Sequence, residues 1–189
     1  MKQAPVLTDK DIKQLLGYLA TTGYHPRNRC MLMLSWLTGM RVGELASLKM
    51  GDVLTPAGEV RTEIQLKKHQ TKGNEGRTVL LNSEARKELA KFLKTRHEKK
   101  DADAPLFATK TGKHFSANGL CQRFIQLYRA AGLDKGTSHG GRRTFITRLA
   151  HKGVNVRVLA ALSGHRSIQT TMRYIDLNEN VLRAAVELA

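Results

Sequence analysis

The sequence has few cysteines: two among 189 residues, Cys30 and Cys121, and neither belongs to a Cys-x-x-Cys pair of the kind that binds zinc. Both stand among apolar neighbours in segments with helical patterns, which predicts buried thiols in a reducing compartment. A chain of this length buries roughly two thirds of its unfolded surface, so an ordinary core can stabilise it without disulfides or structural metals. We therefore expect a folded domain rather than a disordered chain.

Long apolar runs are also missing. The longest, residues 30–40, is interrupted by Ser35, Thr38 and Gly39, and it is too short to cross a bilayer. The N-terminus lacks the apolar segment of a secretory signal peptide. These absences argue against a transmembrane or secreted protein and predict a cytoplasmic location.

Negative charge is scarce. The chain carries 16 Asp and Glu against 32 Lys and Arg, a formal net charge of +16, and residues 135–174 contain no Asp or Glu. An excess of this size calls for an anionic partner, either a nucleic acid or an anionic membrane surface. The basic residues are spread over several segments without one amphipathic anchor, which argues against the membrane surface. We expect the basic stretch to face a polyanion.

The apolar pattern is helical along most of the chain and alternates in one short region only. Thr8 and Asp11 form a capping-box signature before the first helix. Turn-forming residues at 72–76 separate two short alternating segments, which predicts an antiparallel hairpin. The predicted fold class is therefore mainly α with a small antiparallel β-sheet (α+β). Helices are expected at 9–21, at 29–37, near 42, at 83–97 with Ser83 as the cap, at 117–131 and from 142 onward, because Gly140 and Gly141 weaken helix propensity just before. Strands are expected within 59–66 and 78–81. The residues expected in the core are Met31, Met33, Trp36 and Phe124.

Three short patterns combine basic, imidazole and hydroxyl side chains. They contain Arg41 with Glu44, His139 with Arg142, and His165 followed nine residues later by a tyrosine. Each pattern alone is also typical of ordinary structure: a surface ion pair, a histidine at a helix end, or a tyrosine at the rim of a core. Taken together, they meet the requirements of one reaction at a phosphodiester.

The reaction needs positive charge, a nucleophile and proton transfer. Arg41 and Arg142 offer guanidinium forks for the two non-bridging oxygens. A free tyrosine hydroxyl has a pKa of about 10, so a tyrosine nucleophile requires a cationic site and a proton acceptor, and Tyr174 is the candidate. His139, three residues before Arg142, is expected on the same helical face, and Lys72 at the hairpin tip is expected to reach the leaving oxygen as an acid.

These patterns, in this order, resemble the catalytic domain of the tyrosine recombinases, the phage integrase family, and the resemblance extends from about residue 8 to residue 182. The resembling motifs are Thr-Gly-Met-Arg-Val-Gly-Glu-Leu around Arg41, Thr-Lys-Gly-Asn-Glu-Gly-Arg-Thr-Val-Leu-Leu around Lys72, the His-x-x-Arg box of His139 and Arg142, and Leu-Ser-Gly-His-Arg-Ser-Ile-Gln-Thr-Thr-Met-Arg-Tyr, which contains His165 and ends at Tyr174. Arg143 stands where the family often has His. The resemblance implies the fold of DNA breaking-rejoining enzymes.

The resemblance also implies a chemistry without metal or ATP. Tyr174 would attack a DNA phosphate to give a 3′-phosphotyrosine and a free 5′-hydroxyl. Arg41 and Arg142 would hold the phosphate, and His165 would donate a hydrogen bond to it. His139 would act in proton transfer with Tyr174, and Lys72 would protonate the leaving oxygen. Glu44 is expected to orient its neighbouring cations rather than react, because a carboxylate facing the phosphate would oppose binding.

Duplex DNA is the expected partner of the remaining basic residues. About half of them are expected to be ordinary solvated charges, since charge clusters usually are. The candidates for phosphate contacts are Lys67, Lys68, Arg77, Arg143, Arg148, Arg166 and Arg173. The resemblance further implies a homo-oligomer of two to four protomers on DNA, accessory DNA-bending proteins, and a bacterial or phage-encoded protein associated with the nucleoid.

The expected organisation is a single catalytic domain over residues 1–189, without the N-terminal core-binding domain of most family members. The chain is then either a fragment or a short single-domain recombinase. Residues 178–189 are expected either to dock on a neighbouring protomer, as in the family, or to fold back on their own core. Two other functions fit the same chemistry or basic surface: a topoisomerase that relaxes DNA, and an accessory DNA-binding protein without turnover. The catalytic set argues against the accessory protein, because a protein that only binds DNA has no need of Tyr174.

Overall fold

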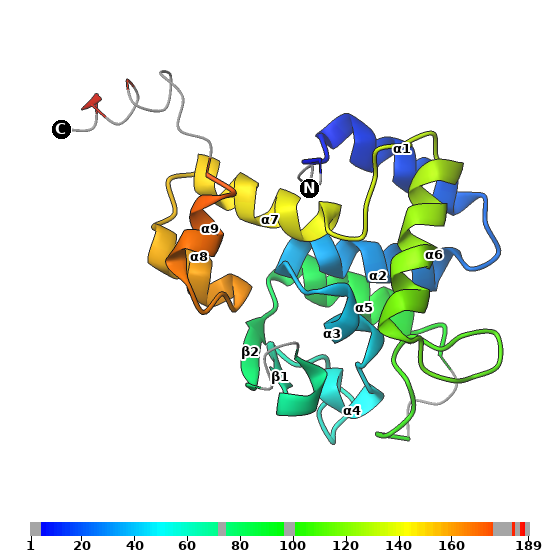
Figure 1. Ribbon diagram of the computed structural model, residues 1–189. Coiled ribbons are helices and arrows are strands. Elements are labelled where there is room, and N and C mark those ends of the chain that lie inside the picture. The colour runs from blue at the N-terminus through cyan, green and yellow to red at the C-terminus, as the bar shows by residue number, and fades with distance from the viewer. Residues whose placement is uncertain (1–4, 72–74, 97–100, 176–182, 184–185, 188–189) are drawn as a thin grey trace. The chain divides into compact units, whose positions relative to one another are not determined.

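The computed structural model describes residues 5–71, 75–96, 101–175, 183 and 186–187, and the chain divides into two compact units, Met1–Phe145 and Ile146–Ala189. The described part is mainly helical with one two-stranded antiparallel sheet, which confirms the predicted fold class (Figure 1). The elements are α1 (Asp9–Ala20), α2 (His25–Thr38), α3 (Val42–Ala46), α4 (Met50–Val53), β1 (Glu63–Leu66), the 3-10 helix η1 (Lys68–Gln70), β2 (Arg77–Leu80), α5 (Ser83–Leu93), α6 (Ala117–Ala130), α7 (Gly140–His151), α8 (Val156–Ser163) and α9 (Ile168–Met172).

The first helix has the predicted cap. The backbone N–H of Asp11 donates to the Thr8 hydroxyl at 3.1 Å, and the backbone N–H of Thr8 donates to the Asp11 carboxylate at 2.8 Å. These two bonds satisfy donors that the first helical turn leaves without a partner. The local signal was therefore sufficient to place the start of α1.

The core of the first unit surrounds α2, which packs against α1, α3 and α5. Met31, Met33 and Trp36 of this helix are buried, and so is Phe124 of α6, as predicted. Helix α2 begins four residues before the predicted start, because a proline in its first turn supports helical geometry and needs no N–H partner there. It ends at a left-handed glycine, Gly39, with φ +65°.

The two cysteines differ in their environments. Cys30 of α2 is 1% exposed, and burial raises the pKa of its thiol well above the ordinary value. Cys121 of α6 is only half-buried. The prediction of a buried thiol is therefore confirmed for Cys30 and wrong for Cys121. Helical periodicity located both residues in helices but could not tell which face of α6 lies toward the core.

The hairpin pairs Glu63 with Leu80 and Leu66 with Arg77. Ile64 and Leu66 of β1 are buried, as alternation along a half-buried strand requires. The first strand, Glu63–Leu66, lies within the predicted range 59–66. The predicted turn at 72–76 falls largely outside the described residues, because residues 72–74 are not among them.

Three predicted helix boundaries need correction, two of α5 and one of α7. Asn82, not Ser83, caps α5: its side chain accepts from the backbone N–H of Ala85 at 2.8 Å. Helix α5 ends at Leu93, short of the predicted residue 97. Helix α7 begins at Gly140 rather than near residue 142, because packing against α2 outweighs the weak helix propensity of the two glycines there. None of the described helices combines the length and apolarity that a bilayer span requires.

A partly buried ion pair joins α2 to α5. Arg29 donates two hydrogen bonds, both at 2.8 Å, to the carboxylate of Glu88, which is 5% exposed. These bonds lower the pKa of Glu88, although burial opposes them. A carboxylate whose pKa is lowered by folding stabilises the protein above its unfolded-state pKa of about 4.3, and this stability is lost as the pH falls through the folded-state pKa.

We therefore expect Glu88→Gln to lower the free energy of unfolding at pH 7 by about 1.5–3 kcal/mol, the usual contribution of hydrogen bonds to a charged group. The difference between the variant and the unchanged chain should shrink as the pH is lowered below about 4. Urea unfolding of both proteins between pH 3 and pH 7 measures it. A difference in unfolding free energy that does not vary with pH would contradict the lowered pKa of Glu88.

Candidate active site

Arg41 lies at the N-terminus of α3, two residues after Gly39 ends α2. Its backbone N–H donates to Glu44 Oε2 at 2.8 Å, and its Nη1 donates to Glu44 Oε1 at 2.9 Å. The Arg41 side chain is 28% exposed, whereas that of Glu44 is 1% exposed. The carboxylate therefore orients Arg41 from beneath the surface.

Arg77, the first residue of β2, binds the same carboxylate. Its Nη2 donates to Glu44 Oε2 at 2.7 Å and its Nε donates to Glu44 Oε1 at 3.1 Å. Burial acts to raise the pKa of Glu44. The hydrogen bonds from Arg77 and from the backbone of Arg41 outweigh this effect, so the pKa lies below its ordinary value. Glu44 is thus an anion held between two guanidinium groups.

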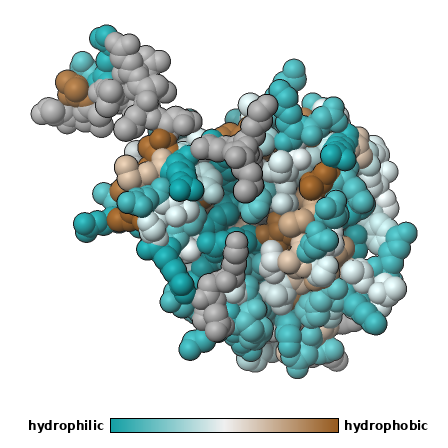
Figure 2. Space-filling model, in the orientation of Figure 1, coloured by the Kyte–Doolittle hydropathy of each residue, from teal (hydrophilic) through white to brown (hydrophobic). Residues whose placement is uncertain are grey.

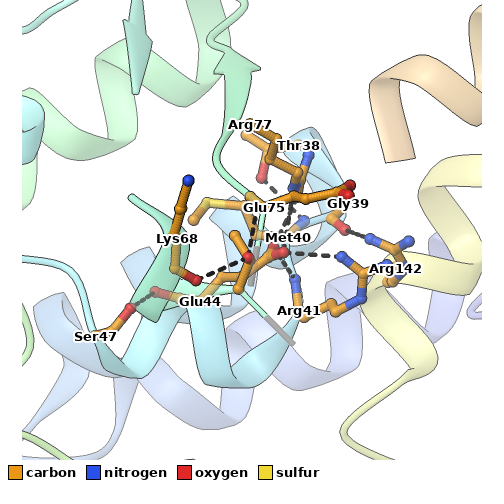
Figure 3. A network of polar contacts seen from close by, with 11 residues as sticks. Thr38, Gly39, Met40, Arg41, Glu44, Ser47, Lys68, Glu75, Arg77 and Arg142 are labelled. Carbon is orange, nitrogen blue, oxygen red and sulfur yellow. Dashed lines mark hydrogen bonds and ion pairs between the residues drawn. The ribbon is translucent and has the colours of Figure 1, made fainter. Parts of the chain in front are cut away.

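Arg142 of α7 reaches the same turn from another part of the first unit. Its side chain is buried, and Nη1 donates to the backbone oxygen of Gly39 at 2.7 Å. Figure 3 shows Arg142, Arg41 and Arg77 around the turn that joins α2 to α3. Two arginines named by separate sequence motifs therefore meet at one place, although they are 101 positions apart in the sequence (142 − 41 = 101).

His139 is exposed in the turn just before α7 begins. Its backbone oxygen accepts from the N–H of Arg143 at 2.9 Å, which begins the hydrogen bonding of the helix. The predicted shared helical face with Arg142 is therefore wrong in detail, because His139 precedes the helix. The imidazole is nonetheless accessible.

Lys72 lies outside the described residues, but the chain on both sides of it is held. The buried side chain of Gln70 donates to the backbone oxygen of Ser47 at 3.2 Å and to Asp52 at 3.0 Å. The hydroxyl of Thr71 donates to the backbone oxygen of Glu75 at 2.6 Å, across the base of the turn. No local pattern in the sequence points to Gln70, because its partners are 18 and 23 residues away.

His165 and Tyr174 lie together in the second unit. Their rings stack with centroids 5.7 Å apart and planes 19° apart. His165 follows Gly164, the left-handed residue that ends α8, and its Nδ1 lies 2.8 Å from the hydroxyl oxygen of Thr171, a fully buried residue of α9. The backbone N–H of Tyr174 donates to the backbone oxygen of Thr171 at 2.9 Å. Thr171, which sequence reasoning also missed, therefore holds both residues.

The remaining basic candidates differ in exposure. Arg143 is half-buried, and Arg77 is engaged by Glu44. Hydrophilic side chains cover most of the face that Figure 2 shows. Within the described ranges, no three His, Cys, Asp or Glu side chains are grouped as metal ligands would be. The exposed candidates are Lys67, Lys68, Arg148, Arg166 and Arg173.

Comparison with known proteins shows what this chain is similar to in sequence and in fold. The model of the phage integrase family matches residues 5–180. Tyrosine recombinase XerC of Lactobacillus leichmannii is 29% identical over 164 residues, which cover 84% of this chain and 53% of XerC. The crystal structure of XerA recombinase has a TM-score of 0.77 and 27% identity, and covers 100% of this chain and 65% of that chain.

A second solved structure, the Tn1549 transposon integrase in complex with a circular intermediate DNA, also has a TM-score of 0.77. Its identity is 21%, with 100% of this chain and 67% of that chain covered, so this likeness concerns the fold. The chain spans about half the length of the first curated relatives that it matches.

Proposed function

Because the chain belongs to the phage integrase family, we propose that it breaks and rejoins DNA strands as the catalytic domain of a site-specific recombinase. The observation that carries this proposal is the convergence of Arg41 and Arg142 on one turn, together with a tyrosine stacked on a histidine. The similarity to proteins named tyrosine recombinases supports it. A protein that only bound DNA would need neither feature.

In the proposed reaction, the hydroxyl oxygen of Tyr174 attacks the scissile phosphorus and the bond to the 5′-oxygen breaks. The product is a 3′-phosphotyrosine, and Lys72 supplies the proton that makes the leaving group a 5′-hydroxyl. Arg41 and Arg142 stabilise the charge on the non-bridging oxygens. His139 takes part in removing the tyrosine proton, and His165 donates a hydrogen bond to the phosphate.

The second half of the reaction reverses the first with a different 5′-hydroxyl. One phosphodiester is exchanged for another, so the step conserves bond energy and is proposed to need no metal or ATP. Glu44 does not take part in bond making: it is buried beneath Arg41 and orients that guanidinium. The exposed basic candidates supply affinity for the backbone of duplex DNA, which carries little sequence information.

The assembly is part of the same proposal. We propose that two to four copies act together on DNA, with accessory bending proteins where the site requires them. The tail at residues 178–189, the candidate for docking on a neighbouring protomer, lies almost entirely outside the described residues. The single-domain organisation over residues 1–189 likewise stays a proposal.

A trapping assay tests the function. Duplexes from the DNA that flanks the coding sequence are nicked so that the short 5′-hydroxyl fragment diffuses away after cleavage. With EDTA present and ATP absent, we expect a covalent protein–DNA adduct that carries a label from the 5′ end of the cut strand. A label retained from the 3′ end would contradict the 3′-phosphotyrosine, and DNA binding without an adduct would favour the accessory function.

The contact between the Thr171 hydroxyl and Nδ1 of His165 can be tested by substitution. Thr171→Val removes the hydroxyl at nearly the same side-chain volume, so His165 loses the partner of its Nδ1. We expect single-turnover cleavage to slow about tenfold, because misplaced catalytic groups lose rate steeply. Thr170→Val, at the adjacent position of α9, is the matched control. Unchanged cleavage by Thr171→Val would mean that the stack on Tyr174 alone orients the imidazole.

A further inference from the structure

We infer that Arg77 is a positioning residue that acts through Glu44: it balances the Glu44 carboxylate, so that Arg41 presents net positive charge to a DNA phosphate. The inference rests on the proposed function, because it assigns Arg41 to the phosphate. It gives Arg77 a role different from the direct DNA contact expected from the sequence.

The geometry of the carboxylate is the first support. Both oxygens of Glu44 accept from Arg77, at 2.7 Å and 3.1 Å, in the two-pronged arrangement that suits a guanidinium. Arg41 shares one of these oxygens through Nη1 and binds the other through its backbone N–H. One carboxylate thus joins the start of β2 to the start of α3.

Burial is the second support. Glu44 is 1% exposed, and Arg77 is 12% exposed, less than half the 28% of Arg41. A buried carboxylate is costly unless cations balance it. Of the two guanidinium groups, that of Arg41 is the more accessible to solvent and to a ligand, whereas that of Arg77 binds the carboxylate through two nitrogens.

Charge explains why this matters for the reaction. Arg41, Glu44 and Arg77 together carry one net positive charge (+1 − 1 + 1 = +1). Without Arg77, Glu44 would neutralise Arg41, and the attraction of the pair for a phosphate would fall. Because the transition state gathers negative charge on the phosphate oxygens, this loss should slow cleavage of DNA that is already bound.

The key experiment compares single and double variants in single-turnover cleavage at saturating DNA. We expect Arg77→Gln to slow cleavage about tenfold, and Arg77→Lys, which keeps the charge, to retain most of the rate. The double variant Glu44→Gln with Arg77→Gln restores the net charge of +1 and should cleave faster than Arg77→Gln alone. A purely structural role predicts the opposite, because the double variant removes more of the network.

Arg86→Gln is the matched control, because it removes one positive charge from an exposed position on α5. We expect its cleavage rate to equal that of the unchanged chain. If Arg77→Gln instead weakens DNA binding and lowers its salt dependence while bound DNA is cleaved at the normal rate, Arg77 contacts phosphate directly and the inference is wrong.

A titration separates this inference from the proposed function. In the chain without DNA, carbon NMR of the Glu44 carboxyl group should show a higher pKa in Arg77→Gln than in the unchanged chain. An unchanged pKa would overturn the inference even if the chain recombines DNA. Failure of the unchanged chain to form any adduct would overturn the proposed function, and with it the assignment of Arg41 to a phosphate, whatever the titration shows.

Discussion

Tyr174→Phe is expected to abolish the covalent protein–DNA adduct and to leave DNA binding intact. The substitution removes one atom, the phenolic oxygen, which is the proposed nucleophile. The ring remains, so the stack on His165 and the backbone hydrogen bond to Thr171 are retained. The loss should therefore be complete for covalent chemistry, because no other group in the mechanism forms a bond to phosphorus.

The measurement is the trapping assay, with DNA affinity determined in parallel by gel shift. Tyr24→Phe is the control, since Tyr24 is an exposed tyrosine just before α2 and removal of its oxygen should leave the adduct unchanged. An adduct of normal yield with Tyr174→Phe would assign the nucleophile to another residue. Loss of DNA binding in the variant would point to a structural role for the hydroxyl instead.

Gly141→Ala is expected to destabilise the protein strongly. Helix α7 approaches α2 so closely that a Cβ at Gly141 would overlap Ser35 and lie 2.6 Å from Cδ1 of Trp36. Both neighbours are buried, so neither has room to move away. Overpacking of this kind costs about 1–3 kcal/mol, and each kcal/mol lowers the melting temperature of a chain of this size by roughly 2–4 °C.

The preceding residue is a matched control. A Cβ at Gly140 would lie 3.7 Å from its nearest neighbours, Leu7 and the backbone oxygen of Pro5, which is ordinary contact. Gly140→Ala should therefore be neutral, or stabilising by up to about 1 kcal/mol through helix propensity. Thermal unfolding of both variants decides the matter: equal melting temperatures would show that α7 is not held against α2 at this distance.

The sequence indicated only part of the structural role of Gly140 and Gly141. Gly140 and Gly141 predicted a late helix start, near residue 142, because helix propensity is a local quantity. The helix in fact begins at Gly140, and the reason is tertiary: the small residue at 141 lets two helices approach. The two glycines therefore predicted a weak helix start, whereas in the structure Gly141 allows close contact between α7 and α2.

Local patterns in the sequence predicted the helices and the hairpin, the cap of α1 and the candidate residues Arg41, Arg142, His165 and Tyr174. These follow from periodicity, capping and short motifs, all of which act over a few residues. The pairing of His165 with Tyr174 was also within reach, since nine residues separate them and α9 lies between. Local order along the chain carries this information.

The partners of these residues that are distant along the chain follow from the folded structure and not from local patterns. Arg77 binds Glu44 across 33 positions, and Arg142 binds the backbone of Gly39 across 103. From the sequence, Arg77 was only a candidate for DNA contact, because an exposed arginine and an arginine bound to a buried carboxylate look the same in a list of residues. Burial and packing make that distinction, since the cost of an unbalanced charge arises only where the folded chain excludes water.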